Sequence, residues 1–355
     1  MFKVKIHPHW EIVQGAETPL DTTALLALLR AIELTGSIAQ AAKSVDVSYR
    51  YAWGLLKEAE RLFDNALMQT QRGRGTVLTP LAQKLLWADR RIAARLSPTL
   101  DSLASELESE LEKLVHHKSD AVRIDASHGF AVAALINQLH AIQLPVELRY
   151  RNSTDAVSAL ARHECDLAGF HVPLGLFESR AAARYLSTLK TKEHCLIHLA
   201  VRHQGLFVAA GNPKQISGLT DLIRTDVRFV NRQAGSGTRA LLELMLAEAG
   251  LSADAIAGFQ TAEFTHSAVA AFIASGMADV GFGVQTAAER FGLTFIPLAQ
   301  ERYFLAADKA AMDTPLIQQV LALIRSDGYR SVVDELAGYD ASATGQVMTL
   351  EQAFG

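Results

Sequence analysis

Cysteine is scarce in this sequence of 355 residues, which contains only Cys165 and Cys195. Both lie in segments that resemble strands or strand ends, so we expect buried free thiols rather than a disulfide framework or a metal site. Long apolar runs are also absent, since no stretch approaches the roughly 18 consecutive apolar residues of a membrane-spanning helix. The first residues lack the apolar segment of a signal peptide. We therefore expect a cytoplasmic protein.

The sequence also has little net charge, −4 with neutral histidine, but that charge is unevenly distributed. Residues 1–95 contain 13 Lys and Arg against 9 Asp and Glu, whereas the remainder contains 21 against 29. A modestly basic N-terminal part is compatible with nucleic acid, although this excess alone does not establish it. The length and a hydrophobic content of 49% favour two or three globular domains.

Three short helices are predicted near the N-terminus, after strand-like runs at residues 3–6 and 10–13. Asp21 is expected to cap the first helix and Gly36 to end it. Ser37 opens a capping-box pattern for the second helix. Ser48, which follows a turn, is expected to cap the third. This spacing predicts a helix-turn-helix, in which the third helix enters a major groove of DNA.

Polar residues around these helix starts are the candidates for contact with DNA bases and phosphates. Most belong to the outer face of the third helix, whose other residues, among them Trp53, are expected largely to pack inward. The candidates are Ser37, Ser48, Tyr49, Arg50, Tyr51 and Lys57.

A tight Arg-Gly-Arg-Gly turn follows and joins two strand-like runs within residues 67–80. A hairpin with Arg72 and Arg74 at its tip is how a wing contacts the phosphate backbone or the minor groove. The alternative is a solvated, glycine-rich hairpin, but its position after a helix-turn-helix favours the wing. Residues 1–80 are therefore predicted to form a winged helix-turn-helix domain.

One long helix is predicted next, and residues 81–118 are assigned to a linker and dimerisation helix. Apolar residues recur along it at spacings of three, four and seven, which marks a single seam. The seam either packs on its own domain or pairs with a second copy, and the length of the helix favours pairing. Pro80 suits a first helical turn, and Pro98 should kink or divide the helix. The seam comprises Leu81, Leu85, Ile92, Leu96, Leu100, Leu103, Leu107, Leu111 and Leu114.

The N-terminal motifs resemble those of a known family, the molybdate-responsive ModE regulators, and more distantly the LysR type. The resemblance covers about the first hundred residues, and the strand-like start favours the ModE form. It implies a homodimer joined through the N-terminal region and the long helix, which binds a roughly palindromic operator. The motifs are Thr35-Gly36-Ser37-Ile38, Ala41-Ala42, Val47-Ser48-Tyr49-Arg50, Ala52-Trp53 and Arg72-Gly73-Arg74-Gly75-Thr76-Val77-Leu78-Thr79-Pro80.

Strand-like and helical runs alternate through residues 119–355, which predicts an open α/β sheet in two lobes, the second over about 205–303. The strand-like runs include 122–126, 146–150, 165–169, 227–231 and 278–282.

The run at 227–231 leads through a glycine-rich turn into a helix. Free N–H groups and the positive end of a helix dipole meet there, so we expect an anion. The alternative is a tight turn with a serine or threonine cap. The expected ligand residues are Gln233, Ser236, Gly237, Thr238 and Arg239.

Other polar residues follow the strands of the predicted sheet. Ligands collect at the carboxyl ends of strands in open α/β sheets, so we expect these residues to face one cleft. Each one alone is also explained as a helix cap or a satisfied polar group. The candidates are Ser127, His128, Thr154, His171, Thr265 and His266.

The C-terminal part resembles the type II periplasmic-binding-protein-like domain that is fused to ModE-type units. The matching stretches include Ala126-Ser127-His128, Asp166-Leu167-Ala168-Gly169-Phe170-His171, the run from Asn231 to Arg239, and Ala278-Asp279-Val280-Gly281-Phe282-Gly283. The resemblance implies two lobes that close on a small anion, linked to molybdate or tungstate. Relatives often carry an acidic residue where this chain has Gly129, so the identity of the ligand is not transferred.

We therefore expect a transcription regulator that senses a small oxyanion and assembles as a dimer or tetramer, with no cofactor and no metal site. One alternative is a LysR-type regulator that responds to a carboxylate such as formate. In that comparison, Arg239 in the cleft would favour a carboxylate, and hydroxyl and N–H groups alone would favour a tetrahedral oxyanion. Two further hypotheses are an enzyme that uses His128, His171 and His266 near Ser236, and a binding protein without a DNA role.

Overall fold

The computed structural model describes residues 3–14, 19–71, 75–116 and 121–355. The chain forms two compact units. One contains His7–Ala94, and the other contains Arg95–Gly355 together with Ile6 and the described residues before it. The division falls inside the helix α4 (Pro80–His116), which continues through Pro98. Of the two outcomes predicted at Pro98, a kink or a division of the helix, the division does not occur. Among the described residues, no helix combines the length and the apolar character needed to cross a membrane.

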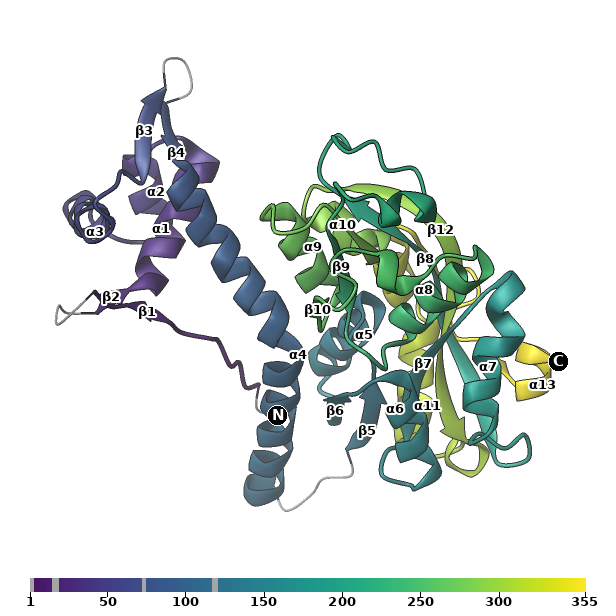
Figure 1. Ribbon diagram of the computed structural model, residues 1–355. Helices are drawn as coiled ribbons and strands as arrows, with labels where there is room; N and C mark the ends of the chain where they lie inside the picture. The colour runs from purple at the N-terminus through teal and green to yellow at the C-terminus, as the bar shows by residue number, and fades with distance from the viewer. Residues whose placement is uncertain (1–2, 15–18, 72–74, 117–120) are drawn as a thin grey trace. The chain divides into compact units, whose positions relative to one another are not determined.

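The N-terminal unit contains three helices followed by a hairpin, in the predicted order (Figure 1). The helices are α1 (Thr22–Thr35), α2 (Ile38–Ser44) and α3 (Tyr49–Phe63). The predicted caps are confirmed, since Asp21, Ser37 and Ser48 accept hydrogen bonds from the first-turn N–H groups of α1, α2 and α3. Gly36 ends α1 in a left-handed conformation with φ of 64°, as predicted.

Four short strands accompany these helices as two antiparallel pairs. They are β1 (Glu11–Ile12) with β2 (Leu20–Asp21), and β3 (Met68–Gln71) with β4 (Gly75–Leu78). The second pair is anchored at the α1–α2 turn, where the N–H of Thr76 donates to the carbonyl of Gly36 at 2.8 Å. The predicted strand at residues 3–6 does not form. There the N–H of Val4 instead donates to Oε1 of Glu108 at 2.6 Å.

The C-terminal unit is built on one large sheet with the order β10-β9-β11-β8-β12-β7-β5-β6. The strands are β5 (Val122–Ala126), β6 (Val146–Tyr150), β7 (Leu167–Pro173), β8 (His194–Val208), β9 (Phe229–Arg232), β10 (Ala262–Glu263), β11 (Val280–Val284) and β12 (Thr294–Asp308). The short strands β13 (Tyr339–Asp340) and β14 (Val347–Met348) pair with β8. Of the predicted strands, β7, β9 and β11 begin two residues later and also end later than expected, because their buried runs continue beyond the predicted ends.

Two long antiparallel strands, β8 and β12, connect the two lobes. One end of β12, Glu301–Ala307, pairs with β7 of the first lobe. One end of β8, Gln204–Val208, pairs with β11 of the second lobe. At the join, Arg202 of β8 lies opposite Glu301 of β12 in the strand register. The guanidinium of Arg202 and the carboxylate of Glu301 therefore lie where the two lobes meet.

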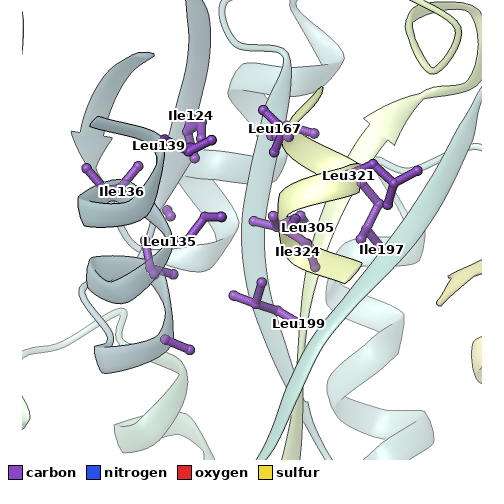
Figure 2. Packing of buried hydrophobic residues seen from close by; sticks show 14 of the residues in the cluster. Ile124, Leu135, Ile136, Leu139, Leu167, Ile197, Leu199, Leu305, Leu321 and Ile324 are labelled. Atoms are coloured by element: carbon purple, nitrogen blue, oxygen red, sulfur yellow. The ribbon is translucent and has the colours of Figure 1, made fainter. Parts of the chain in front are cut away.

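Helices cover both faces of the sheet, and most of them begin within a few residues of the end of a strand. They are α5 (Phe130–Ala141), α6 (Ser153–Ala161), α7 (Glu178–Leu186), α8 (Gly237–Glu248), α9 (His266–Ala274), α10 (Gln285–Arg290), α11 (Pro315–Arg325), α12 (Asp327–Asp334) and α13 (Leu350–Phe354). In the first lobe, buried aliphatic side chains of α5 and α11 pack against β5, β7, β8 and β12 (Figure 2). Cys165 and Cys195 are buried free thiols, as predicted. Three further buried clusters pack α6, α8 and α9 against the sheet, so the starts of these helices lie beside the join.

Candidate functional site

A cavity of about 390 Å³ opens between the two lobes of the C-terminal unit. Its walls come from the ends of β5, β6 and β9, from β7 and β8, and from the first turns of α6, α8 and α9. A stretch of α4 adds a further wall. The lining residues are Pro98, Thr99, Ser102, Leu103, Ser127, His128, Tyr150, Arg151, Asn152, Ser153, His171, Arg202, Arg232, Gln233, Ser236, Gly237, Thr238, Phe264 and His266.

The structure brings together eight of the residues chosen from the sequence as ligand contacts. They are Ser127, His128, His171, Gln233, Ser236, Gly237, Thr238 and His266. They come from both lobes, and all except His171, which lies within β7, follow the end of a strand, as in other open α/β sheets. Their gathering at one cavity is what makes this the candidate ligand site.

Two of the first-lobe residues are held by aromatic side chains. Oγ of Ser127 lies 3.2 Å from the hydroxyl of Tyr303, which belongs to β12. The ring of His128 lies 4.9 Å from the ring of Tyr150. Burial lowers the pKa of His128 to about 4, with a further contribution from Arg232 and Arg290. His128 is therefore neutral at neutral pH.

His171 lies deep in the cavity wall and has one ring nitrogen available. Its Nδ1 lies 3.3 Å from Oγ of Ser153. Its Nε2 has no hydrogen-bond partner among the residues that the structure describes, and it lies 3.8 Å from Oε2 of Glu301. Burial lowers the pKa of His171 to about 4 despite the opposing effect of Glu301. The free nitrogen thus belongs to a neutral imidazole beside the cavity.

Arg202 and Glu301 form a buried ion pair at the join of the lobes. Nε of Arg202 donates to Oε1 of Glu301 at 2.5 Å, and both side chains are at most 2% exposed. Gln204 donates to the same Oε1 at 2.7 Å and to Oγ1 of Thr238 at 3.3 Å. Burial raises the pKa of the Glu301 carboxyl, but Arg202 and His171 outweigh it and hold that pKa below its usual value. The charge of Arg202 is thereby neutralised locally.

Arg232 lies at the end of β9. Unlike the other two arginines of the cavity, it forms no ion pair with a carboxylate of the described residues. One terminal nitrogen, Nη2, donates to the carbonyl of Phe264 at 2.7 Å. Nε and Nη1 are buried and have no hydrogen-bond partner among the described residues. Burial, with help from Arg202, lowers the pKa of Arg232 to about 9, so it stays charged at neutral pH. Arg232 therefore offers two buried N–H donors and a positive charge to an acceptor in the cavity.

The start of α8 adds backbone donors to the same region. Oγ of Ser236 caps this helix by accepting from the N–H of Arg239 at 3.2 Å. The N–H groups of its first turn point toward the cavity end of the helix, where the helix dipole is positive. Such an end attracts an anion, and Gly237 and Thr238 of this turn line the cavity.

His266 at the start of α9 supplies one more donor. Its Nδ1 accepts from the N–H of Val284 at 3.3 Å, so the proton of the neutral ring lies on Nε2. Burial holds the pKa of His266 well below its usual value, with Arg232 as a second cause. A neutral imidazole N–H is thus available at the cavity wall.

Three predicted ligand residues do not line the cavity. Thr154 is exposed in the first turn of α6, because Asn152 caps that helix and Ser153 faces inward. Thr265 is fully buried and its hydroxyl accepts from the N–H of Ala268 as the cap of α9. Arg239 donates to Glu243 at 2.9 Å instead, and its guanidinium lies 5.0 Å from the ring of Phe259.

Three arginines that do line the cavity, Arg151, Arg202 and Arg232, were not expected from the sequence. Arg202 lies inside a strand whose register with β12 brings it opposite Glu301, and no local motif marks that pairing. Arg232 lies between the strand-like run 227–231 and the predicted ligand residue Gln233, so its position at the end of a strand is a local signal for the site. The wall from α4 was also not expected.

The predicted DNA-contact residues lie in the N-terminal unit. Tyr49, Arg50, Tyr51 and Lys57 belong to the exposed side of α3, whereas the hydroxyls of Ser37 and Ser48 act as helix caps. The expectation that Trp53 packs inward is wrong. It is 41% exposed, its ring stacks 6.3 Å from that of Tyr49, and the amine of Lys57 lies 5.0 Å above it. Arg72 and Arg74 lie outside the described residues.

Among the described residues, no three or more His, Cys, Asp or Glu side chains lie close enough together to hold a metal ion. The cavity residues are mainly donors, namely guanidinium, imidazole and hydroxyl groups. Such a set binds anions rather than cations.

Two proteins are similar to a part or to most of this chain. The molybdenum transport protein ModE of Herbaspirillum seropedicae is 45% identical over 73 residues, which cover 19% of this chain and 27% of ModE. A cysteine-to-serine mutant of OxyR from Corynebacterium glutamicum, with H2O2 bound, shares 14% identity at a TM-score of 0.45, over 88% of this chain and 93% of OxyR. The predicted resemblance to ModE regulators is confirmed as a sequence similarity, over about a quarter of the length of ModE.

A further relative is similar over a longer stretch. The protein YvgK of Bacillus subtilis, described as uncharacterized, is 33% identical over 213 residues, which cover 59% of this chain and 67% of YvgK. The family model of the PBP superfamily domain matches residues 136–325, which include β6 to β12 and most of the cavity wall. The chain therefore belongs to the PBP superfamily, through the two-lobed α/β domain that encloses the cavity.

Proposed function

We propose that the protein is a DNA-binding transcription regulator of the ModE type whose two-lobed domain binds a small anion. The observation that carries the anion is Arg232, a buried guanidinium with two donors that no described residue accepts. A buried charge without a partner costs several kcal/mol. A bound anion removes that cost, which explains why such a group is kept in a cavity wall.

The N-terminal unit supports the DNA-binding role. Its order of α1, α2, α3 and the β3–β4 hairpin is that of a winged helix-turn-helix, with α3 as the recognition helix. The exposed side of α3 carries Arg50, Lys57 and two tyrosines, which suit contacts to phosphates and base edges. Arg72 and Arg74 remain proposed wing contacts. The sequence similarity to ModE over 73 residues also supports a DNA-binding role.

The charge balance of the cavity favours an anion. Arg202 is neutralised by Glu301, and Nε of Arg151 pairs with Asp125 at 2.9 Å. Arg232 is left with a net positive charge, and the three cavity histidines are neutral donors. Charge-assisted hydrogen bonds of this kind contribute about 1.5–3 kcal/mol each. An anion that meets Arg232, His266 and the start of α8 is therefore held strongly.

We propose a tetrahedral oxyanion of the molybdate or tungstate class as the effector. Backbone N–H groups, hydroxyls and neutral imidazoles surround the available volume and suit four acceptor oxygens. The second candidate effector is a small carboxylate such as formate. It is favoured by an arginine that lines the cavity, Arg232 rather than the expected Arg239, because the planar guanidinium matches two carboxylate oxygens.

The cavity size bears on both candidates. Its volume of about 390 Å³ is at the lower end of ordinary small-molecule pockets and exceeds that of a single molybdate or formate ion. A small anion would therefore fill it only if the lobes close further. Lobe closure is also the step by which a ligand shifts the protein between two states. We propose that closure changes how two copies of the chain present their α3 helices to an operator.

We propose binding without catalysis. Ser153 and His171 have the pairing of a nucleophile and a base, since Oγ and Nδ1 are 3.3 Å apart. However, a pKa of His171 of about 4 makes this ring a weak base at neutral pH. Ser153 is also buried at the start of α6, with 2% exposure.

Calorimetry with the full-length protein tests the effector. Sodium molybdate, tungstate, sulfate, phosphate and formate are titrated in turn. Heat from molybdate or tungstate with none from formate supports the oxyanion, and the reverse supports the carboxylate. Absence of heat from all of them contradicts the sensor role. Selection of bound fragments from random duplex DNA tests the other half, and failure to enrich any sequence contradicts specific DNA binding.

A further inference from the structure

The helix that leads to the N-terminal unit itself borders the ligand cavity. Pro98, Thr99, Ser102 and Leu103 of α4 belong to the lining. These residues lie in the C-terminal unit, beyond the point where the two units divide. Resting on the proposed function of the cavity, we infer that residues 95–103 of α4 form a third wall of the effector site and contact the bound anion directly.

Hydrogen bonds attach this part of α4 to the first lobe. Oγ of Ser102 accepts from the N–H of Tyr150 at 2.9 Å, and Oγ of Ser105 accepts from the N–H of Leu148 at 2.8 Å. Both N–H groups belong to β6, the last strand in the sheet order, so the helix satisfies an otherwise unpaired edge. Further along α4, Oε2 of Glu108 lies 3.7 Å from Nε2 of His140.

A different set of contacts attaches the same stretch to the second lobe. Nε of Arg95 lies 3.6 Å from Oε2 of Glu263, at the end of β10. The Arg95 guanidinium also lies 5.8 Å from the ring of Phe264, which lines the cavity. Residues 95–105 of α4 thus contact both lobes, one turn after another.

These contacts give α4 a role in sensing. Closure of the lobes changes the distance between β6 and β10, and α4 is fixed to both. Thr99 lines the cavity, and a threonine hydroxyl is able to donate to a bound anion. Pro98 has no N–H to donate, which weakens the helix in the turn where the two units divide. The anion therefore orders residues 95–103 directly, and the helix carries that change toward residue 80.

Two tryptophan variants of the full-length protein test the direct contact. Leu103 lines the cavity, whereas Leu107 lies one turn further along α4, is 42% exposed and does not belong to the lining. We expect Leu103→Trp to weaken molybdate or formate binding about tenfold or more by filling the cavity, and Leu107→Trp to change it less than about twofold. Because both leucines belong to the same apolar seam, an effect on self-association alone would appear in both variants. Equal affinities in the two variants overturn the inference.

Amide hydrogen exchange decides the attachment of α4 without any ligand. Slow exchange at Leu148 and Tyr150 in wild type, and faster exchange in Ser105→Ala and Ser102→Ala respectively, supports the third wall. Exchange at the rate of an unprotected amide in wild type overturns it. If wild type gives no heat with any of the anions but protects these two amides, the proposed function fails while the position of α4 stands. With a binding anion, slower exchange in residues 95–105 of α4 is expected, and unchanged exchange there contradicts the direct contact.

Discussion

Gly237 at the start of α8 lies directly against the imidazole of His171, since a Cβ at position 237 would come within 2.3 Å of Nε2. The two residues belong to different lobes, and Nε2 is the ring nitrogen left without a partner among the described residues. Real Cβ atoms do not approach so closely, so any side chain at this position moves the helix or the ring. The absence of a side chain at Gly237 is what allows the first-turn N–H groups of α8 and Nε2 of His171 to lie close together.

Replacement of Gly237 tests this arrangement. Gly237→Ala is expected to weaken anion binding about tenfold or more, because it separates the α8 N–H groups from His171. Gly218→Ala is the matched control, since a Cβ there meets nothing within 4 Å. Calorimetry with molybdate and formate measures both variants. Wild-type affinity in Gly237→Ala would contradict the role given to this contact.

The buried histidines predict a pH dependence of stability. Burial lowers the pKa of His128 and of His171 from 6.5 to about 4, so the unfolded chain binds more protons between those values. The free energy of unfolding therefore falls as the pH drops from about 6.5 toward about 4. Glu301 adds a loss in the same direction at lower pH, because its pKa lies below its usual value in the folded protein.

Urea denaturation at about pH 7 and about pH 5 measures this effect. Each of these two histidines is expected to reduce the stability by about 2 kcal/mol over that interval. In His171→Gln the reduction is smaller than in wild type by that amount. An identical reduction in the variant would show that His171 is exposed to water in the folded protein.

The exposed side of α3 predicts an electrostatic part of DNA binding. Arg50→Ala is expected to weaken binding about tenfold and to reduce the salt slope by about one, because one phosphate contact is lost. Arg180→Ala, at an exposed position of α7, serves as the control. Fluorescence anisotropy on a selected DNA fragment at several salt concentrations measures both. Equal salt slopes in the two variants would exclude a phosphate contact from Arg50.

Local signals predicted the helix starts well. Asp21, Ser37 and Ser48 cap their helices because a cap needs only a short side chain and the N–H groups two or three residues later. The polar residues at strand ends were also located, since parallel strands share one direction. Both features depend on neighbours in the chain.

Features that depend on distant residues escaped prediction. Arg202 and Glu301 meet only through the register of β8 and β12, which are far apart in the sequence. The sequence analysis named Arg239 and missed Arg232, because the arginine that lines the cavity is decided by where β9 ends and by which face of α8 turns inward. Trp53 was assigned to the core from its apolar character, yet it stacks on Tyr49 at the surface of the N-terminal unit.

Exposed leucines of α4 predict self-association. Leu107 is 42% exposed and Leu114 is 74% exposed, and both belong to the predicted seam. Leu107→Glu with Leu114→Glu is expected to shift a dimer toward monomer, because two charges enter an apolar interface. Leu176→Glu, at a residue 74% exposed outside α4, should leave the mass unchanged. Sedimentation equilibrium compares them, and a monomeric wild type would contradict the paired helix.

The central claim is that Arg232 binds the effector anion, and calorimetry on matched variants tests it most directly. Arg232→Gln removes the buried charge, whereas Arg239→Gln removes an arginine of the same lobe that pairs with Glu243 outside the cavity. Urea midpoints confirm that both variants fold. The account predicts that Arg232→Gln binds the anion about 10- to 100-fold more weakly than wild type while Arg239→Gln binds it normally. Undiminished binding by Arg232→Gln, or loss of binding only in Arg239→Gln, would contradict the account.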